Sequence, residues 1–211
     1  MFKEHGKHIV MGGLLLSIPI IVGLLFYPQL PSEMPIHFNF SGEVDQYTHP
    51  LFVIVGLPIL LYLLTLFIIW LMRSDPKKEN IHPKMQMVSI YLLPVIGNVI
   101  CLYLISYALG LKLNAFLVVD LLLGVLFLIL GNYVTKGSQN FTVGLRTRWT
   151  MHSRLNWNMS NRLAGRCMVL SGIIFIISAI FNQLILPLIF VLISSVIVPI
   201  IYSYLLYRKG I

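Results

Sequence analysis

The chain has few charged residues, few acids and almost no cysteine, and each shortage excludes a class of protein. Only 10% of its 211 residues are charged, and seven are Asp or Glu. The two cysteines, Cys101 and Cys167, lie in different apolar runs, so no disulfide framework exists and both are expected to pack as soft apolar side chains. No apolar run contains a histidine, which argues against a metalloprotease with two histidines one helical turn apart. We see no nucleophile paired with a base, and we predict no catalytic residue, no metal, no cofactor and no enzyme activity.

Long apolar runs dominate the sequence instead, since 58% of the residues are hydrophobic. Most of these runs approach the ~20 residues that ~30 Å of hydrocarbon requires. They cover residues 9–27, 51–72, 87–109, 115–134, 163–181 and 184–207. We therefore predict an all-α polytopic membrane protein with six transmembrane helices, forming a single membrane domain over residues 1–211 without an internal repeat.

The basic residues predict which way the spans run. All Lys and Arg residues except Lys112 lie in or beside alternate gaps between the runs. Because basic segments resist translocation, both termini and segments 73–86 and 135–162 should be cytoplasmic, and segments 28–50, 110–114 and 182–183 should face outward. We call 28–50 the outward loop and 135–162 the inward loop.

The same bias explains the net charge of +8. The positive charges are spread along membrane-adjacent segments, where lipids with anionic headgroups are their nearest partners. We therefore predict membrane lipids as partners, no direct binding of nucleic acid, and a location in the bacterial plasma membrane.

The outward loop combines prolines, which hold it extended, with a turn at Ser41-Gly42. Around His37, polar and aromatic residues alternate with period two, which indicates a short strand or an extended segment. Three interpretations stay open. In the first, the turn is fixed by hydrogen bonds to loop backbone from His37, Asn39 and Asp45. In the second, the loop's acids and histidines bind a metal, although they lack the spacing of a known metal motif. In the third, the loop recognises an external ligand.

The inward loop holds two of the three tryptophans, Trp149 and Trp157. From Thr150 onward it lacks Gly and Pro until Gly165, so a helix capped by Thr150 or Ser153 should lead into the fifth span.

At ~100° per residue, one stripe of that helix is apolar and should bury into lipid or the bundle. The stripe consists of Met151, Leu155, Met159 and Leu163. Trp157 projects to nearly the opposite side, near Arg154, Asn158 and Asn161. This second face is either an interfacial Trp anchor with Arg at the headgroups, or a docking face for a cytoplasmic protein or another part of the chain.

Together the two loops resemble the SdpI family of bacterial membrane immunity proteins. The outward string runs from Pro35 to Asp45 and includes His37, Asn39 and Gly42. The inward string contains Gly131, Asn132, Asn140, Gly144, Leu145, Arg146, Thr147, Trp149, Thr150, Trp157, Asn161 and Arg162. The resemblance covers nearly the whole chain, and the two strings in order around matching spans are more specific than either alone.

What the resemblance implies is protection of the cell against a secreted, membrane-active peptide toxin. It also implies a second role, in which the membrane protein sequesters a cytoplasmic transcriptional repressor. The toxin or partner would bind at His37, Asn39, Asp45, Asn140, Gly144, Arg146, Thr147, Trp149, Trp157, Asn161 and Arg162. One departure is Arg148, where the family usually has proline, which would restrict the preceding residue. The absence of proline implies either that this turn tolerates other residues or that this chain has drifted from the toxin specificity of the family.

A final candidate is Asp120, the one acid within the spans. A charge facing lipid costs on the order of 2.5 to 3.5 kcal/mol, so Asp120 should face the bundle interior, with Tyr103 or Lys112 as partner. It is either a structural hydrogen-bonding group or part of a proton or ion path. The second reading supports the alternative function, a small ion-coupled transporter or exporter, although no inverted repeat is visible.

Overall fold

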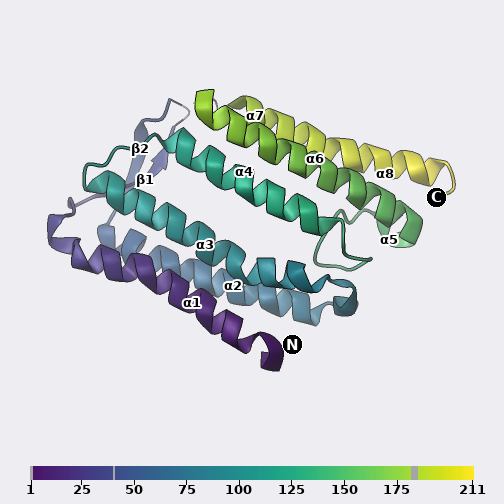
Figure 1. The fold of residues 1–211 in the computed structure, drawn as a ribbon, viewed down its shortest axis with the longest axis horizontal. Coiled ribbons are helices and arrows are strands. Elements are labelled where there is room, and N and C mark those ends of the chain that lie inside the picture. The colour runs from purple at the N-terminus through teal and green to yellow at the C-terminus, as the bar shows by residue number, and fades with distance from the viewer. Residues whose placement is uncertain (1, 40, 182–184) are drawn as a thin grey trace. The chain divides into compact units, whose positions relative to one another are not determined.

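The computed structural model describes residues 2–39, 41–181 and 185–211. Within these ranges, six helical stretches are long and apolar enough to cross a membrane (Figure 1). They are His5–Leu25, Phe52–Ser74, Pro83–Ala108, Ala115–Val134, Arg154–Phe181 and Pro187–Arg208. Each overlaps one predicted run, which confirms the helical multi-pass architecture. The predicted outward turn at 182–183 lies outside the described residues.

The helices expose much of their apolar surface. The first four long helices are α1 (Phe2–Leu25), α2 (Leu57–Ser74), α3 (Pro83–Ala108) and α4 (Ala115–Val134). Leu25 is 71% exposed and Leu63 is 57% exposed. Side chains of this kind need an apolar surrounding, and lipid supplies it. The chain is therefore a multi-pass protein of the cell membrane.

Two spans contain a short π-helical turn just before a proline. The turn η2 (Phe52–Gly56) precedes α2 and Pro58, and the turn η4 (Leu192–Ile197) joins α7 (Ile185–Val191) to α8 (Val198–Arg208), which contains Pro199. Proline cannot donate to the carbonyl four residues earlier, and its ring crowds that carbonyl. A wider turn accommodates both effects and keeps the helix continuous.

The described chain groups into two compact units, and each is treated by itself. One comprises Met1–Trp70 with Ser89–Val118, and the other comprises Leu71–Val88 with Val119–Ile211. The single membrane domain stays a prediction.

In the first unit a β-hairpin is built from the outward loop. The strands β1 (Met34–Phe38) and β2 (Val44–Thr48) pair antiparallel, with an irregular register around His37. Phe38 packs its ring against Tyr103 and Tyr107 of α3, with centroids 5.7 and 5.1 Å apart. The expected short strand is confirmed. The two-stranded sheet that it forms was not part of the all-α prediction.

The core of the first unit lies below this hairpin. Met34, Val53 and Ile54 are fully buried, and Leu104 and Ile105 of α3 join them. Asn98 also joins α3 to α1, because its amide donates to Leu15 O at 2.9 Å. The same amide donates to Pro94 O within α3 at 2.9 Å. The hairpin therefore rests on a packed base.

In the second unit, glycines bring α4 close to α6 (Arg154–Phe181). Gly124 and Gly131 on α4 face Gly172 and Gly165 on α6. A Cβ on Gly172 would lie 2.7 Å from Gly124 O, and one on Gly131 would lie 2.7 Å from Gly165 O. Small residues allow such close backbone approach between membrane helices. We call these four residues the glycine seam.

Hydroxyl and amide groups join α6 to the last span. Ser171 lies 3.0 Å from the Ser195 hydroxyl of η4, and the Asn156 amide donates to Ser203 O of α8 at 2.9 Å. Asn156, Ser171 and Ser203 are fully buried. Their hydrogen bonds satisfy polar groups that would otherwise be costly in an apolar interior.

Candidate functional site

The inward loop is organised by helix caps. Its short helix α5 (Arg148–His152) has Thr147 as N-cap: the Thr150 N–H donates to Thr147 Oγ1 at 3.1 Å, and the Thr147 N–H donates to Thr150 Oγ1 at 2.9 Å. These reciprocal bonds form a capping box. The sequence offered Thr150 or Ser153 as the cap of the helix that leads into the fifth span, and Thr150 is not that cap. Ser153 does cap α6, because its Oγ accepts from the Asn156 N–H at 3.3 Å, and that prediction is confirmed.

Asn140 shapes the turn that precedes these helices. Its Oδ1 accepts from the N–H groups of Thr142 and Val143 at 3.0 and 2.6 Å, and its Nδ2 donates to Ser138 O at 2.8 Å. The side chain is 1% exposed. Asn140 therefore serves the loop's own backbone.

Gly144 and Asn161 join the loop to α6. Gly144 has a φ of +106°, a region that favours glycine, and an added Cβ would lie 2.5 Å from Asn161 Oδ1. That same oxygen accepts from the Leu145 N–H at 2.7 Å. The close contact leaves no room for a side chain at position 144.

Trp157 closes the other side of the loop. Its indole N–H donates to Gly137 O at 3.1 Å, and the residue is 1% exposed. The predicted anchor at the membrane interface was wrong, because Trp157 is buried. The alternative, a face on which another part of the same chain docks, is confirmed by its hydrogen bond to Gly137 O. The reason is that the polar backbone of the loop needs partners, so α6 turns its Trp and Asn side chains toward it.

The predicted apolar stripe does not lie on a single helix, because Met151 belongs to α5 and α6 begins only at Arg154. Its three members on α6 lie toward the outside. Leu155 is 55% exposed, while Met159 and Leu163 are half-buried. The buried face consists of Asn156, Trp157, Ser160, Asn161 and Ala164. Of the two predicted surroundings for the stripe, lipid fits this placement and the bundle interior does not.

Asp75, which the sequence analysis missed, holds the inward loop from the segment after α2. Its carboxylate accepts from the N–H of Phe141 at 2.8 Å, the Thr142 hydroxyl at 2.7 Å and the N–H of Lys77 at 2.7 Å. Burial alone would raise the pKa of the Asp75 carboxyl, but these hydrogen bonds together hold its pKa below the usual value. An acid directly before Pro76 in a predominantly basic segment was the available signal.

Four candidate side chains of the inward loop remain accessible, two of them exposed and two half-buried. Arg146 is exposed and donates from its guanidinium to Phe141 O, and Arg162 is exposed on α6. Trp149 is half-buried, with its ring centroid 5.1 Å from that of Tyr204. Thr147, also half-buried, has its hydroxyl 3.0 Å from that of Ser203. A partner on this side would therefore meet Arg146 and Arg162, with Trp149 and Thr147 only partly accessible.

The outward hairpin presents a polar pair at its edge. His37 Nδ1 lies 2.5 Å from Asp45 Oδ1, and their side chains are 57% and 39% exposed. Asn39 fixes the turn at Gly42, because its Oδ1 accepts from the N–H groups of Ser41 and Glu43 at 2.9 and 3.0 Å. The predicted backbone role is confirmed for Asn39 but wrong for His37 and Asp45, which bond to each other. In the described part of the chain, no three metal-ligating side chains gather.

Asp120 of α4 is fully buried, which confirms that it faces the interior. Ser178 of α6 donates to Asp120 Oδ2 at 2.9 Å, while Oδ1 has no hydrogen-bond partner within the described residues. Of the two residues predicted as partners, Tyr103 donates its hydroxyl to Leu113 O at 3.2 Å and Lys112 is exposed, and both belong to the other compact unit. Asp120 thus forms a helix-to-helix hydrogen bond, as the structural interpretation requires.

Comparison with known proteins confirms the predicted resemblance. Residues 136–203 match the model of the SdpI/YfhL protein family, and residues 14–62 match a domain of unknown function, DUF1648. The chain is 24% identical over 208 residues to the immunity protein SdpI of Bacillus subtilis (strain 168), covering 96% of this chain and 97% of that protein. No solved structure matches.

Proposed function

We propose that this chain is an immunity protein of the bacterial plasma membrane, which protects its cell from a secreted, membrane-active peptide toxin. The observation that carries the proposal is its similarity to an immunity protein along 96% of this chain and 97% of the relative. Because both chains are covered almost end to end, the spans and both loops have counterparts in that protein.

The geometry of the inward loop favours binding over catalysis. Asn140 and Asn161 direct their side-chain oxygens to backbone N–H groups, and Trp157 donates to a backbone carbonyl. These residues therefore hold the loop in shape, whereas a catalytic group must be free to meet a substrate. We propose a protein without enzyme activity.

The outward hairpin is the proposed toxin-facing surface. The edge formed by His37 and Asp45 is exposed, while Phe38 on the other face is packed against α3. A polar edge on a packed base can bind a partner without large ordering costs. If each described span crosses once, three spans separate this hairpin from the inward loop, so the two loops are expected on opposite sides.

The test is survival of a toxin-sensitive bacterium that expresses this chain and is challenged with a cognate peptide toxin of the SdpI family. An empty vector gives the baseline, and membrane abundance is equalised. We expect the parent to protect, and His37→Ala with Asp45→Ala to reduce protection at least tenfold in toxin concentration. The matched control is Glu33→Ala with Gln46→Ala, two exposed positions of the same loop.

Protection by the parent and by the control pair, with loss in the His37 and Asp45 pair, supports recognition at the hairpin edge. Equal protection by both pairs would refute that edge as the toxin site while leaving immunity intact. A parent that fails to protect at normal abundance against any cognate toxin tested would overturn the proposed function.

The inward loop is where we place a cytoplasmic partner, such as a transcriptional repressor. Phe141 is 50% exposed beside Arg146, and Lys77 Nζ lies 5.5 Å from the Phe141 ring centroid. Exposed aromatic and arginine side chains are common anchors in protein interfaces.

Site-specific crosslinking from position 141 in cells should capture a repressor when toxin is present, and Arg146→Ala should reduce capture more than Arg148→Ala. Equal capture in the two variants would argue against this surface.

Asp120 discriminates this proposal from an ion-coupled transporter. We expect Asp120→Asn to retain protection and membrane potential, because an amide can still accept the hydrogen bond from Ser178. Loss of protection together with a changed potential, at normal abundance, would favour the transporter.

A further inference from the structure

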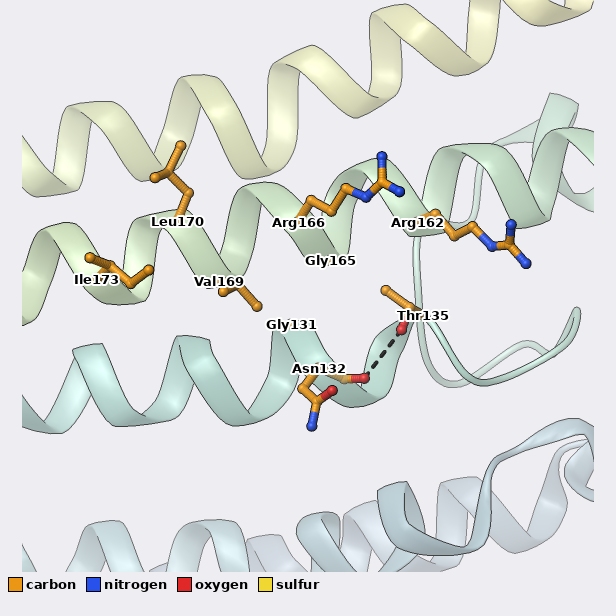
Figure 2. A pocket seen from close by; sticks show the side chains of 9 residues that line it. All are labelled: Gly131, Asn132, Thr135, Arg162, Gly165, Arg166, Val169, Leu170 and Ile173. Atoms are coloured by element: carbon orange, nitrogen blue, oxygen red, sulfur yellow. Dashed lines mark hydrogen bonds between the residues drawn. The ribbon is translucent and has the colours of Figure 1, made fainter.

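A groove opens between α4 and α6 at the end of the glycine seam. Its volume is about 650 Å³, within the range of small-molecule sites, ~300–1,000 Å³. The groove is lined by Gly131, Asn132, Thr135, Arg162, Gly165, Arg166, Val169, Leu170 and Ile173 (Figure 2). Gly131 and Gly165 line it where the two helices are in close contact.

The two ends of the groove differ in chemistry. Figure 2 shows Arg162 at one end and Ile173 at the other, with Arg166 between them. Leu170 and Ile173 are 49% and 44% exposed, so the apolar end is open to an apolar occupant. The groove therefore offers positive charge at one end and hydrocarbon at the other.

Neither arginine is neutralised by the protein. Both are exposed, and within the described residues neither guanidinium has a hydrogen bond or an ion pair. The two residues lie four apart on α6, so they share one face of the helix. Figure 2 shows the Asn132 amide on the side of α4 that is turned away from α6, so it does not join the two arginines. Two neighbouring guanidinium groups can contact one phosphate.

Arg162 and Arg166 lie near the boundary between the hydrocarbon and the headgroups of a bilayer. Arg166 lies fifteen residues before Phe181, the end of α6, which is about 22 Å at ~1.5 Å per residue. Since hydrocarbon is ~30 Å thick, Arg166 sits some 8 Å inside it, and Arg162 lies one turn closer to the headgroups. An arginine at this depth extends toward the headgroups or binds an anion.

We propose that this groove binds one anionic phospholipid of the inner leaflet. The headgroup phosphate lies between Arg162 and Arg166, and an acyl chain runs past Val169, Leu170 and Ile173. Charge complementarity and the change from basic to apolar along one groove select this occupant, because a soluble phosphate would leave the apolar end empty. Basic pockets between helices on the cytoplasmic side are known lipid sites.

The test uses the purified full chain in neutral detergent with a low mole fraction of phosphatidylglycerol and an equal amount of phosphatidylcholine. Native mass spectrometry counts the lipids retained, and no charged surface is present to mimic a site. We expect one phosphatidylglycerol per chain in preference to phosphatidylcholine. Arg162→Gln with Arg166→Gln should weaken retention by roughly 10- to 100-fold.

The matched control is Arg148→Gln with Arg154→Gln, two exposed arginines outside the groove with the same change in net charge. The control should retain phosphatidylglycerol within about twofold of the parent, and thermal unfolding should verify that both double variants fold. If the groove variant is misfolded, Ile173→Arg provides a second route, since a charge at the apolar end should also reduce retention.

Excess glycerol phosphate tests the source of the anion. If the protein retains the lipid in the presence of glycerol phosphate, the proposal is supported. If glycerol phosphate displaces the lipid and binds with the same affinity, the lipid is overturned as the occupant. Equal retention of both lipids, or equal losses in the groove and control variants, would also overturn it.

Discussion

Gly144 is subject to two constraints, a positive φ and a lack of space. Comparison with Gly110, which has only the positive φ, separates their effects on stability. Its φ is +106°, and an added Cβ would meet Asn161 Oδ1. Gly110 has a similar φ of +98° but nothing within 4 Å. We expect Gly144→Ala to destabilise the folded chain by ~1–3 kcal/mol and Gly110→Ala by about 1 kcal/mol. Thermal unfolding in detergent measures both, and equal effects would contradict the crowding at Gly144.

Asp75 should make the stability of the inward loop depend on acid. The pKa of the Asp75 carboxyl is lowered in the folded chain. Its contribution to the free energy of unfolding is therefore present above the ordinary pKa and is lost as pH falls through the folded pKa. At pH 7, Asp75→Asn should cost ~1–3 kcal/mol, because one carboxylate oxygen that accepts hydrogen bonds becomes a donor. The difference between parent and variant should shrink below about pH 4.

Melting temperatures of both proteins across pH 7 to 3 would measure this difference. Glu79→Gln is the matched control, since Glu79 is an exposed acid of the same segment, and its effect should stay within about 0.5 kcal/mol. A difference for Asp75→Asn that grows as pH falls would contradict the lowered pKa.

At the level of single residues, the sequence indicated which positions matter better than it indicated their roles. Asn140, Gly144, Trp157 and Asn161 stood out through the family string, and all of them contribute to the inward loop. Their burial could not be predicted, because the partners are backbone groups brought near by tertiary folding. Asp75 was missed for the same reason, since its partner Phe141 lies far along the chain.

The glycine seam determines how closely α4 and α6 approach. A Cβ on Gly165 would lie 2.6 Å from Gly131 O, which is backbone and cannot move aside alone. We expect Gly165→Ala to destabilise the chain by ~1–3 kcal/mol through overpacking. Gly6 of α1 has nothing within 4 Å, so Gly6→Ala should be neutral or stabilise by up to ~1 kcal/mol.

Thermal unfolding of the two alanine variants, side by side, tests the seam. A Gly165→Ala protein as stable as the parent would mean that the two helices pack less closely than described. The comparison is matched, because both changes replace a helical glycine by the best helix former.

Elements were predictable where one physical rule dominates. Span number followed from the length and apolarity that a bilayer requires, and the short strand around His37 followed from its period-two alternation. The faces of α6 were not predictable, since both faces carry apolar side chains and the choice depends on the loop that covers Trp157. The π-helical turns before Pro58 and Pro199 also left no signal beyond the prolines.

For the whole molecule, the basic residues predict one orientation, which labelling can check. In a background with Cys101→Ala and Cys167→Ala, Ser41→Cys places a thiol in the outward loop and Lys136→Cys places one in the inward loop. Both positions are exposed. In intact cells, a membrane-impermeant maleimide should label position 41 and spare position 136 until the membrane is opened. The reverse pattern would invert the topology, and labelling of both would contradict an odd number of crossings between the loops.

Trp157 also gives the inward loop an optical reporter. Trp70 is 58% exposed and Trp149 is half-buried, so replacing both by Phe leaves one emitter shielded from water and hydrogen-bonded to Gly137. Its fluorescence should shift to longer wavelength when the loop opens and water reaches the indole. Docking of a cytoplasmic partner, or local unfolding in acid, could then be followed without an attached dye.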